Sequence, residues 1–132
     1  MEAGTELPPR LAGYPRIALR SARLEVRVAR TFRARLLGLA GLRGLPRDCG
    51  LLLPATRSAH TLGMRFALDL VWLDRRGNVV RIDSGVARGR LRSCRAAAGL
   101  LELAGGQAAE AELVVGGHAL SPGAGTGGGR GQ

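Results

Sequence analysis

The chain has 132 residues, 45% of them hydrophobic, which suits a single domain with a modest core. No apolar run approaches the roughly 20 residues that a membrane-spanning helix needs, so an integral membrane protein built from helices is excluded. The net charge is +10 and all 20 basic residues are arginine. Anionic molecules are therefore a class of binding partner to consider.

The two ends of the sequence differ from its middle. Residues 1–15 contain three prolines and predict an extended lead-in. Residues 121–132 are rich in glycine and too poor in apolar side chains to offset the entropy of ordering, which predicts a disordered tail. We expect one globular domain over residues 16–120. The N-terminus lacks the apolar segment of a secretory signal, so a cytoplasmic location is expected.

The first half of the domain predicts short strands and one helix. Apolar residues alternate with charged ones over residues 24–28, the period of a half-exposed strand, and residues 17–19 predict a preceding strand. Thr31 can cap a short helix through residues 32–37. Residues 50–53 predict a short buried strand before a proline.

The middle of the chain predicts a β-hairpin. Residues 68–73 form a nearly continuous apolar run, as expected of a strand covered on both faces. Residues 74–78 supply turn residues, with Gly77 available for a positive φ. The chain then returns as a second strand over residues 80–83, with Val80 and Ile82 on one face.

The last part of the domain predicts a strand over residues 100–103 and one helical turn over 107–112. An apolar segment follows at 113–115, with a last short strand near 119–120. Many short strands with one or two short helices predict an α+β fold, mainly β, as a curled antiparallel-rich sheet or a small barrel.

Several segments occur together in one known family, in the same order: VARTFRARLLGLAGL, GLLL, HTLGMRFALDLVWLDRRGNVV, GLLELAGG and VVGGHAL. Over about residues 24–120 the chain resembles the bacterial and archaeal domain of unknown function 192 family, in the subgroup with a His-Thr-x-x-Met-Arg-Phe block. The resemblance implies a compact, mostly β domain and no established activity. Two positions depart from the family pattern. His118 stands where the family usually has aspartate, so a carboxylate that could cap or bind there is missing. Ala55 stands where many relatives have cysteine, so no metal or thiol chemistry of that cysteine is expected here.

A polar turn precedes the core strand and is the candidate binding or structural site. His60 could carry a proton or bind a metal, but no second ligand lies at metal-site spacing, so we favour a ring that holds nearby backbone groups. Thr61 is expected to cap this turn through its hydroxyl. Met64 is expected to pack in the core.

Two carboxylates in apolar strands extend this candidate site. Asp69 lies four residues after Arg65, and a direct ion pair between them needs a bend in the chain. Burying Asp69 is costly without partners, so either it accepts hydrogen bonds from the 60–64 turn, which we favour, or it faces a cleft as an acid or base. Glu102 lies between leucines, so the same two alternatives, a hydrogen-bonded structural role or an acid–base role, apply to it. If Glu102 and Asp69 converge, the pair could support acid–base chemistry.

The sequence gives no other sign of a cofactor. Cys49 and Cys94 form no CxxC motif and are expected to be free thiols, with an inert Cys94 favoured over one activated by nearby arginines. A zinc site that combines both cysteines with His60 and His118 is disfavoured, and no nucleotide-binding motif occurs. We therefore assign no catalytic residue, metal or cofactor.

The leading hypothesis is a non-enzymatic binding or accessory domain. Its site would be the turn over residues 60–69 with the Glu102 strand, and its partner a small ligand or an envelope or secretion protein. An acid–base enzyme that uses His60 with Asp69 or Glu102 is the first alternative. Arginine-mediated nucleic-acid binding is the second, and it is disfavoured because the arginines are spread along the chain and aromatic residues are few.

Overall fold

The computed structural model describes residues 16–17, 24–29, 44–45 and 47–119. Three predicted features lie outside these residues: the lead-in over 1–15, the helix over 32–37 and the tail over 121–132. Within the described part of the chain, no helix is long or apolar enough to cross a bilayer.

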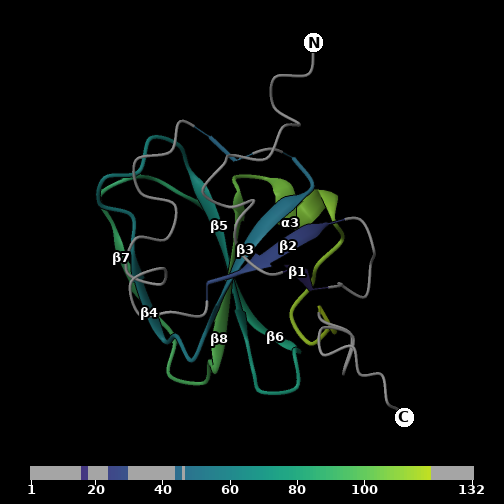
Figure 1. Cartoon of the computed structure of the whole chain (residues 1–132). Coiled ribbons are helices and arrows are strands. Elements are labelled where there is room, and N and C mark those ends of the chain that lie inside the picture. The colour runs from purple at the N-terminus through teal and green to yellow at the C-terminus, as the bar shows by residue number, and fades with distance from the viewer. Residues whose placement is uncertain (1–15, 18–23, 30–43, 46, 120–132) are drawn as a thin grey trace.

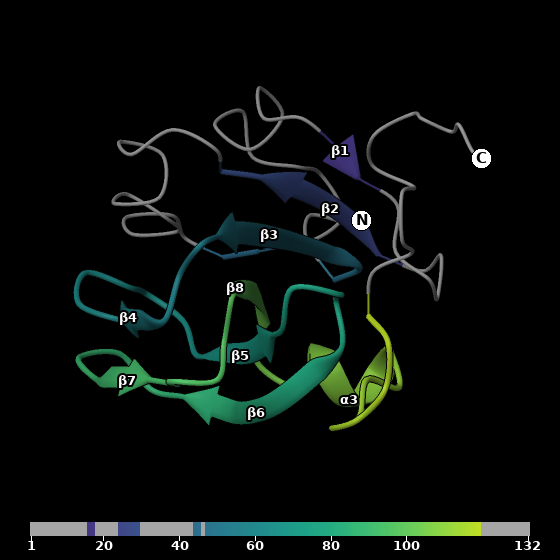
Figure 2. The ribbon, with the colours of Figure 1, turned by 90° about the horizontal axis from the view of Figure 1, so that it is seen from below.

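Six strands form one open, mixed sheet in the order β1-β2-β3-β8-β5-β6. Their bounds are β1 Arg16–Ile17, β2 Glu25–Val28, β3 Cys49–Pro54, β5 Leu68–Leu73, β6 Val79–Val86 and β8 Gly99–Ala104. Among the described strands of this sheet, only β2 and β3 pair in parallel, and every other pair is antiparallel. The edge strands β1 and β6 do not pair, and Figure 2 shows the sheet curving without closing. The predicted mainly β, α+β fold is confirmed as a curled sheet, and the small-barrel alternative is wrong.

A separate two-stranded ribbon and one helical turn complete the described fold. The ribbon pairs β4 (Ser58–His60) with β7 (Leu91–Ser93), and neither strand is predicted from the sequence. The helix α3 (Gln107–Glu110) follows β8, as predicted. Figure 1 places the ribbon on one side of the molecule and α3 on the other.

Strands β2, β3, β5 and β8 match the predicted segments to within one residue at each end. The predicted hairpin is also confirmed, because β5 and β6 pair antiparallel. Its turn uses Gly77 with a φ of 85°, and the Asp74 carboxylate accepts the backbone N–H groups of Arg76 and Asn78 at 2.9 Å each. The Asn78 N–H holds the pKa of Asp74 below its ordinary value.

The last short strand predicted near 119–120 lies partly outside the described residues. Over the described residues 111–119, the only β pairing is an isolated bridge between His118 and Asn78. Glu112 and Gly116 have φ values of 62° and 90°, and a left-handed backbone cannot continue an extended strand. The apolar residues at 114 and 115 are exposed as a result.

The main sheet buries side chains on both faces, because successive residues of a strand point to opposite sides. The first face, here called the Trp72 face, carries Leu51, Leu70 and Leu100 and is covered by the ribbon and its loops. The second, the Val71 face, carries leucines of β5 and β8 beneath α3. Gly50 lies among them, and a Cβ there would come within 2.6 Å of Leu103, so the glycine permits close packing. All six residues of β5 are buried, as predicted.

Candidate binding surface

Asp69 is a buried structural carboxylate on the Val71 face, 1% exposed. Its Oδ1 accepts the backbone N–H of Gly85 at 2.8 Å, and its Oδ2 accepts that of Ala108 at 2.9 Å. These bonds join β5 to β6 and α3. The predicted donors in the 60–64 turn are wrong, because that turn packs through Met64 on the opposite face. Among the described residues Asp69 makes no ion pair with Arg65.

Asp69→Asn is expected to lower the free energy of unfolding by about 2 kcal/mol, because an amide nitrogen would face one of the two backbone N–H groups and leave it unpaired. Urea denaturation followed by circular dichroism measures this loss. Asp48→Asn is the matched control: Asp48 is exposed with a φ of 68°, which asparagine also tolerates, so its change should stay within about 0.5 kcal/mol. Equal stability of the two variants would contradict the structural role of Asp69.

Glu102 lies on the other face of the sheet from Asp69. In the β5–β8 register Glu102 is opposite Leu70 and Asp69 is opposite Leu103, one position along, so their side chains point to opposite sides. Glu102 is 5% exposed, and its Oε1 has no hydrogen-bond partner in the described part of the chain. Burial raises its pKa to about 7. The two carboxylates do not converge, so the paired arrangement considered for acid–base chemistry is wrong.

The other four candidate residues stay together at one end of the ribbon. His60 is exposed at the end of β4, and its Nδ1 accepts the backbone N–H of Leu62 at 3.2 Å. Met64 is buried in the core of the Trp72 face, whereas Arg65 is exposed. The structure thus divides the predicted site into four residues at one end of the ribbon, two exposed and two buried, and two buried carboxylates in the sheet.

The hydroxyl of Thr61 anchors a second loop rather than its own turn. It is 1% exposed, and its Oγ1 accepts the N–H of Arg90 at 2.8 Å and donates to the carbonyl of Ala87 at 2.7 Å. Its backbone N–H donates to the Arg90 carbonyl, and its own carbonyl accepts the N–H of Gly89. These contacts fix the loop after β4 against the loop before β7.

The two joined segments, residues 60–65 and 87–92, are here called the basic tip. Figure 2 shows their loops side by side at the end of the ribbon. The basic tip contains no Asp or Glu, and it carries four arginines: Arg65, Arg88, Arg90 and Arg92. It also carries two exposed leucines, Leu62 and Leu91.

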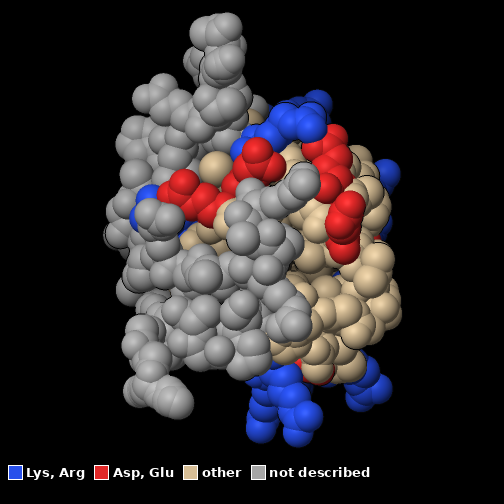
Figure 3. Space-filling model, turned by 90° about the vertical axis from the view of Figure 1, so that its right-hand side faces the viewer, with Lys and Arg blue, Asp and Glu red and all other residues tan. Residues whose placement is uncertain are grey.

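The basic tip and the side of the molecule that carries α3 differ in their charged side chains. Within the described residues, none of the four arginines of the basic tip makes an ion pair. Arg92 only donates through Nη1 to the carbonyl of Leu91 at 3.0 Å. Figure 3 shows the side that carries α3, where acidic side chains gather in the upper part beside basic ones. Glu110 there pairs with Arg47. The exposed carboxylates near α3 include Glu110 and Glu112. The basic tip therefore has no described carboxylate to neutralise it.

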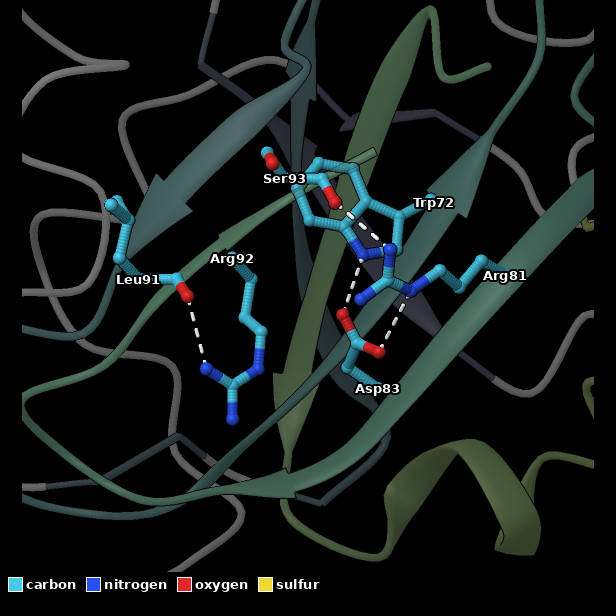
Figure 4. Close-up of polar contacts among 6 residues, drawn as sticks. All are labelled: Trp72, Arg81, Asp83, Leu91, Arg92 and Ser93. Carbon is cyan, nitrogen blue, oxygen red and sulfur yellow. Dashed lines mark hydrogen bonds and ion pairs between the residues drawn. The ribbon is translucent and has the colours of Figure 1, made fainter. Parts of the chain in front are cut away.

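A polar network on the Trp72 face attaches the ribbon to the sheet (Figure 4). Trp72 donates through Nε1 to Oδ2 of Asp83 at 3.0 Å, and Arg81 donates through Nε to Oδ1 at 3.0 Å. Arg81 also donates through Nη1 to the carbonyl of Ser93 in β7, at 2.9 Å. The network connects β5, β6 and β7, and the sequence analysis does not anticipate it.

The described residues contain no group of three or more His, Cys, Asp or Glu side chains that could hold a metal ion. Cys49 and Cys94 are both free and buried, which confirms the expected free thiols. Burial raises the pKa of the Cys49 thiol, so its reactive thiolate form is disfavoured.

The clustering of arginines at the basic tip is missed by the sequence analysis, which considers the arginines by their spacing along the chain. A signal was present in the sequence, since residues 55–68 and 84–98 together contain six arginines and no Asp or Glu. Only the pairing of β4 with β7 brings the two acid-free segments together.

Comparisons with known proteins agree with the fold. The family model DUF192, described as Uncharacterized ACR, matches residues 16–119. The search of curated proteins gives no significant match. A crystal structure from Sinorhizobium meliloti 1021, titled a "putative transcription regulator", is similar with 22% identity and a TM-score of 0.65, over 76% of this chain and 86% of that one. A protein of unknown function from Novosphingobium aromaticivorans DSM 12444 is similar with 20% identity and a TM-score of 0.67, over 87% and 91%. At these identities the likeness shows the fold alone.

Proposed function

This chain belongs to the DUF192 family of uncharacterised proteins, and from that premise we propose that it is a non-enzymatic binding domain that takes an anionic partner through the basic tip. We also infer that it falls in the subgroup marked by a His-Thr-x-x-Met-Arg-Phe block, because residues 60–66 carry that block. Most of the block lies in the basic tip itself.

The observation that carries the proposal is the set of four arginines without a described carboxylate partner. Guanidinium groups bind phosphate, sulfate and carboxylate groups in a bidentate manner, and they remain charged at every physiological pH. Two of them, Arg88 and Arg90, lie on the loop that Thr61 fixes in place. A loop already held in position loses less entropy when a partner binds.

The Sinorhizobium protein is titled a "putative transcription regulator", and a regulator that contacts nucleic acid meets a polyanion. The acid–base alternative has less support, because Asp69 is occupied by two backbone N–H groups and lies on the opposite face from Glu102.

Heparin, a sulfated polyanion, tests the proposal. The double variant Arg88→Gln/Arg90→Gln is expected to bind heparin about tenfold more weakly than the native chain at 0.1 M salt, with a smaller salt dependence. Isothermal titration at several salt concentrations measures both effects.

The matched control is Arg75→Gln/Arg76→Gln, which removes the same charge from the exposed β5–β6 turn, at the other end of β5 from the basic tip. This control is expected to retain most of the native affinity. If both double variants lose affinity equally, binding reports only net charge and the proposal is wrong.

A further inference from the structure

We propose that the anionic partner of the basic tip is the surface of an anionic lipid bilayer, with Leu62 and Leu91 inserted below the headgroups. This inference rests on the proposed function and adds the class of partner. It concerns attachment to a membrane surface, which needs no membrane-spanning helix.

The two leucines are the first part of the argument. Leu62 is 60% exposed and Leu91 is 72% exposed, so most of each side chain is in water. Leu91 lies opposite His60 in the ribbon register, and Leu62 follows two residues after His60. Both leucines therefore belong to the basic tip, and each leaves most of its apolar side chain in water beside the arginines of the same segments.

The combination of charges and leucines separates a bilayer from other polyanions. A leucine offers no hydrogen bond to a phosphate, and a nucleic-acid backbone presents mainly charged and polar groups. A bilayer presents phosphates and an apolar layer a few ångströms apart. The arginines of one tip can therefore bind the phosphates while its leucines enter the apolar layer. Each arginine near an anionic membrane surface strengthens binding by about fivefold.

A second pair of exposed large apolar residues can be compared with the two leucines of the basic tip. Val114 and Val115 are each 61% exposed, but they follow Glu112 on the side of the molecule that carries α3. Acidic side chains there would be repelled by anionic lipid. Exposed apolar residues thus occur at both sides, and only those of the basic tip lie in segments without Asp or Glu.

The anchoring of the basic tip also suits insertion. Thr61 ties the two loops together through side-chain and backbone hydrogen bonds, and Arg81 fixes β7 to β6 through the Ser93 carbonyl. A tip that is already ordered presents its leucines and arginines at a fixed depth relative to one another.

Co-sedimentation of the full chain with vesicles tests the inference. Vesicles of phosphatidylglycerol and phosphatidylcholine are compared with vesicles of phosphatidylcholine alone at 0.1 M salt. The native chain is expected to bind the anionic vesicles and not the neutral ones. Leu62→Ser/Leu91→Ser is expected to weaken that binding by about tenfold or more. Val114→Ser/Val115→Ser, the matched control, is expected to bind as the native chain does.

A parallel titration with a random-sequence DNA duplex separates the possible outcomes. Duplex or heparin binding that needs Arg88 and Arg90, without vesicle binding, would overturn the membrane inference and leave the proposed function standing. Vesicle binding that the leucine pair does not affect would also overturn it. If the arginine pair affects binding to none of these polyanions, the proposed function fails as well.

Discussion

Trp72→Ala is expected to lower the free energy of unfolding by about 3–5 kcal/mol, enough to unfold much of a marginally stable domain. Trp72 is fully buried at the centre of the Trp72 face, among Leu70, Leu100 and their neighbours. Truncation removes the largest apolar surface of that core and leaves a cavity that surrounding side chains fill only in part. It also takes from Asp83 the indole N–H that its Oδ2 accepts.

Urea denaturation followed by circular dichroism measures this effect, since Trp72 is the only tryptophan and its fluorescence is lost in the variant. Trp72→Phe provides the control, because phenylalanine retains much of the buried surface and loses the hydrogen bond to Asp83. Its expected loss is smaller, about 1–2 kcal/mol. A loss below about 1 kcal/mol for the alanine variant would show that the indole is not packed in this core.

The β-hairpin and the strands around Trp72 could be predicted because their signals are local. The apolar run of β5, the turn residues around Gly77 and the short leucine segments of β3 and β8 each specify their own conformation. The order of the strands in the sheet is a different matter, since β8 lies between β3 and β5 through contacts between residues far apart in the chain.

The ribbon could not be predicted because its strands are three residues long and have little apolar character. Their pairing joins residues about thirty positions apart, as in the hydrogen bond between Thr61 and Arg90. Without that pairing, the arginines of the two segments look evenly spread. The basic tip exists only in the folded chain, which is why the sequence analysis placed the candidate site around Asp69 and Glu102 as well.

The separation of Asp69 from Glu102 depends on a single register. A shift of one residue between β5 and β8 would have placed both carboxylates on one face. Each strand could be identified from its own pattern of apolar residues, but the sequence contains no local signal for their alignment. The sheet therefore gives the two carboxylates different environments: Asp69 accepts two backbone N–H groups, and Glu102 lies among leucines.

That environment makes Glu102 the source of a pH-dependent stability. Its pKa is raised from an ordinary value of 4.5 to about 7 by burial. Below pH 4.5 the carboxyl is protonated in both the folded and the unfolded chain. Between about pH 4.5 and pH 7 the unfolded chain loses the proton while the folded chain keeps it, so the free energy of unfolding falls as the pH rises. The total fall is about 3 kcal/mol, at 1.36 kcal/mol for each unit of pKa shift.

Glu102→Gln is therefore expected to remove this fall, and the native chain should lose about 3 kcal/mol relative to the variant between pH 4.5 and pH 8. The buried amide has its own cost, but that cost does not change with pH, so the difference between the two curves isolates the carboxyl group. Urea denaturation at half-unit intervals of pH measures it. Glu112→Gln, which alters an exposed carboxylate, should give a curve parallel to the native one. Parallel curves for Glu102→Gln and the native chain would show that the Glu102 carboxylate is solvated in the folded protein, and the environment inferred from its leucine neighbours would then be wrong.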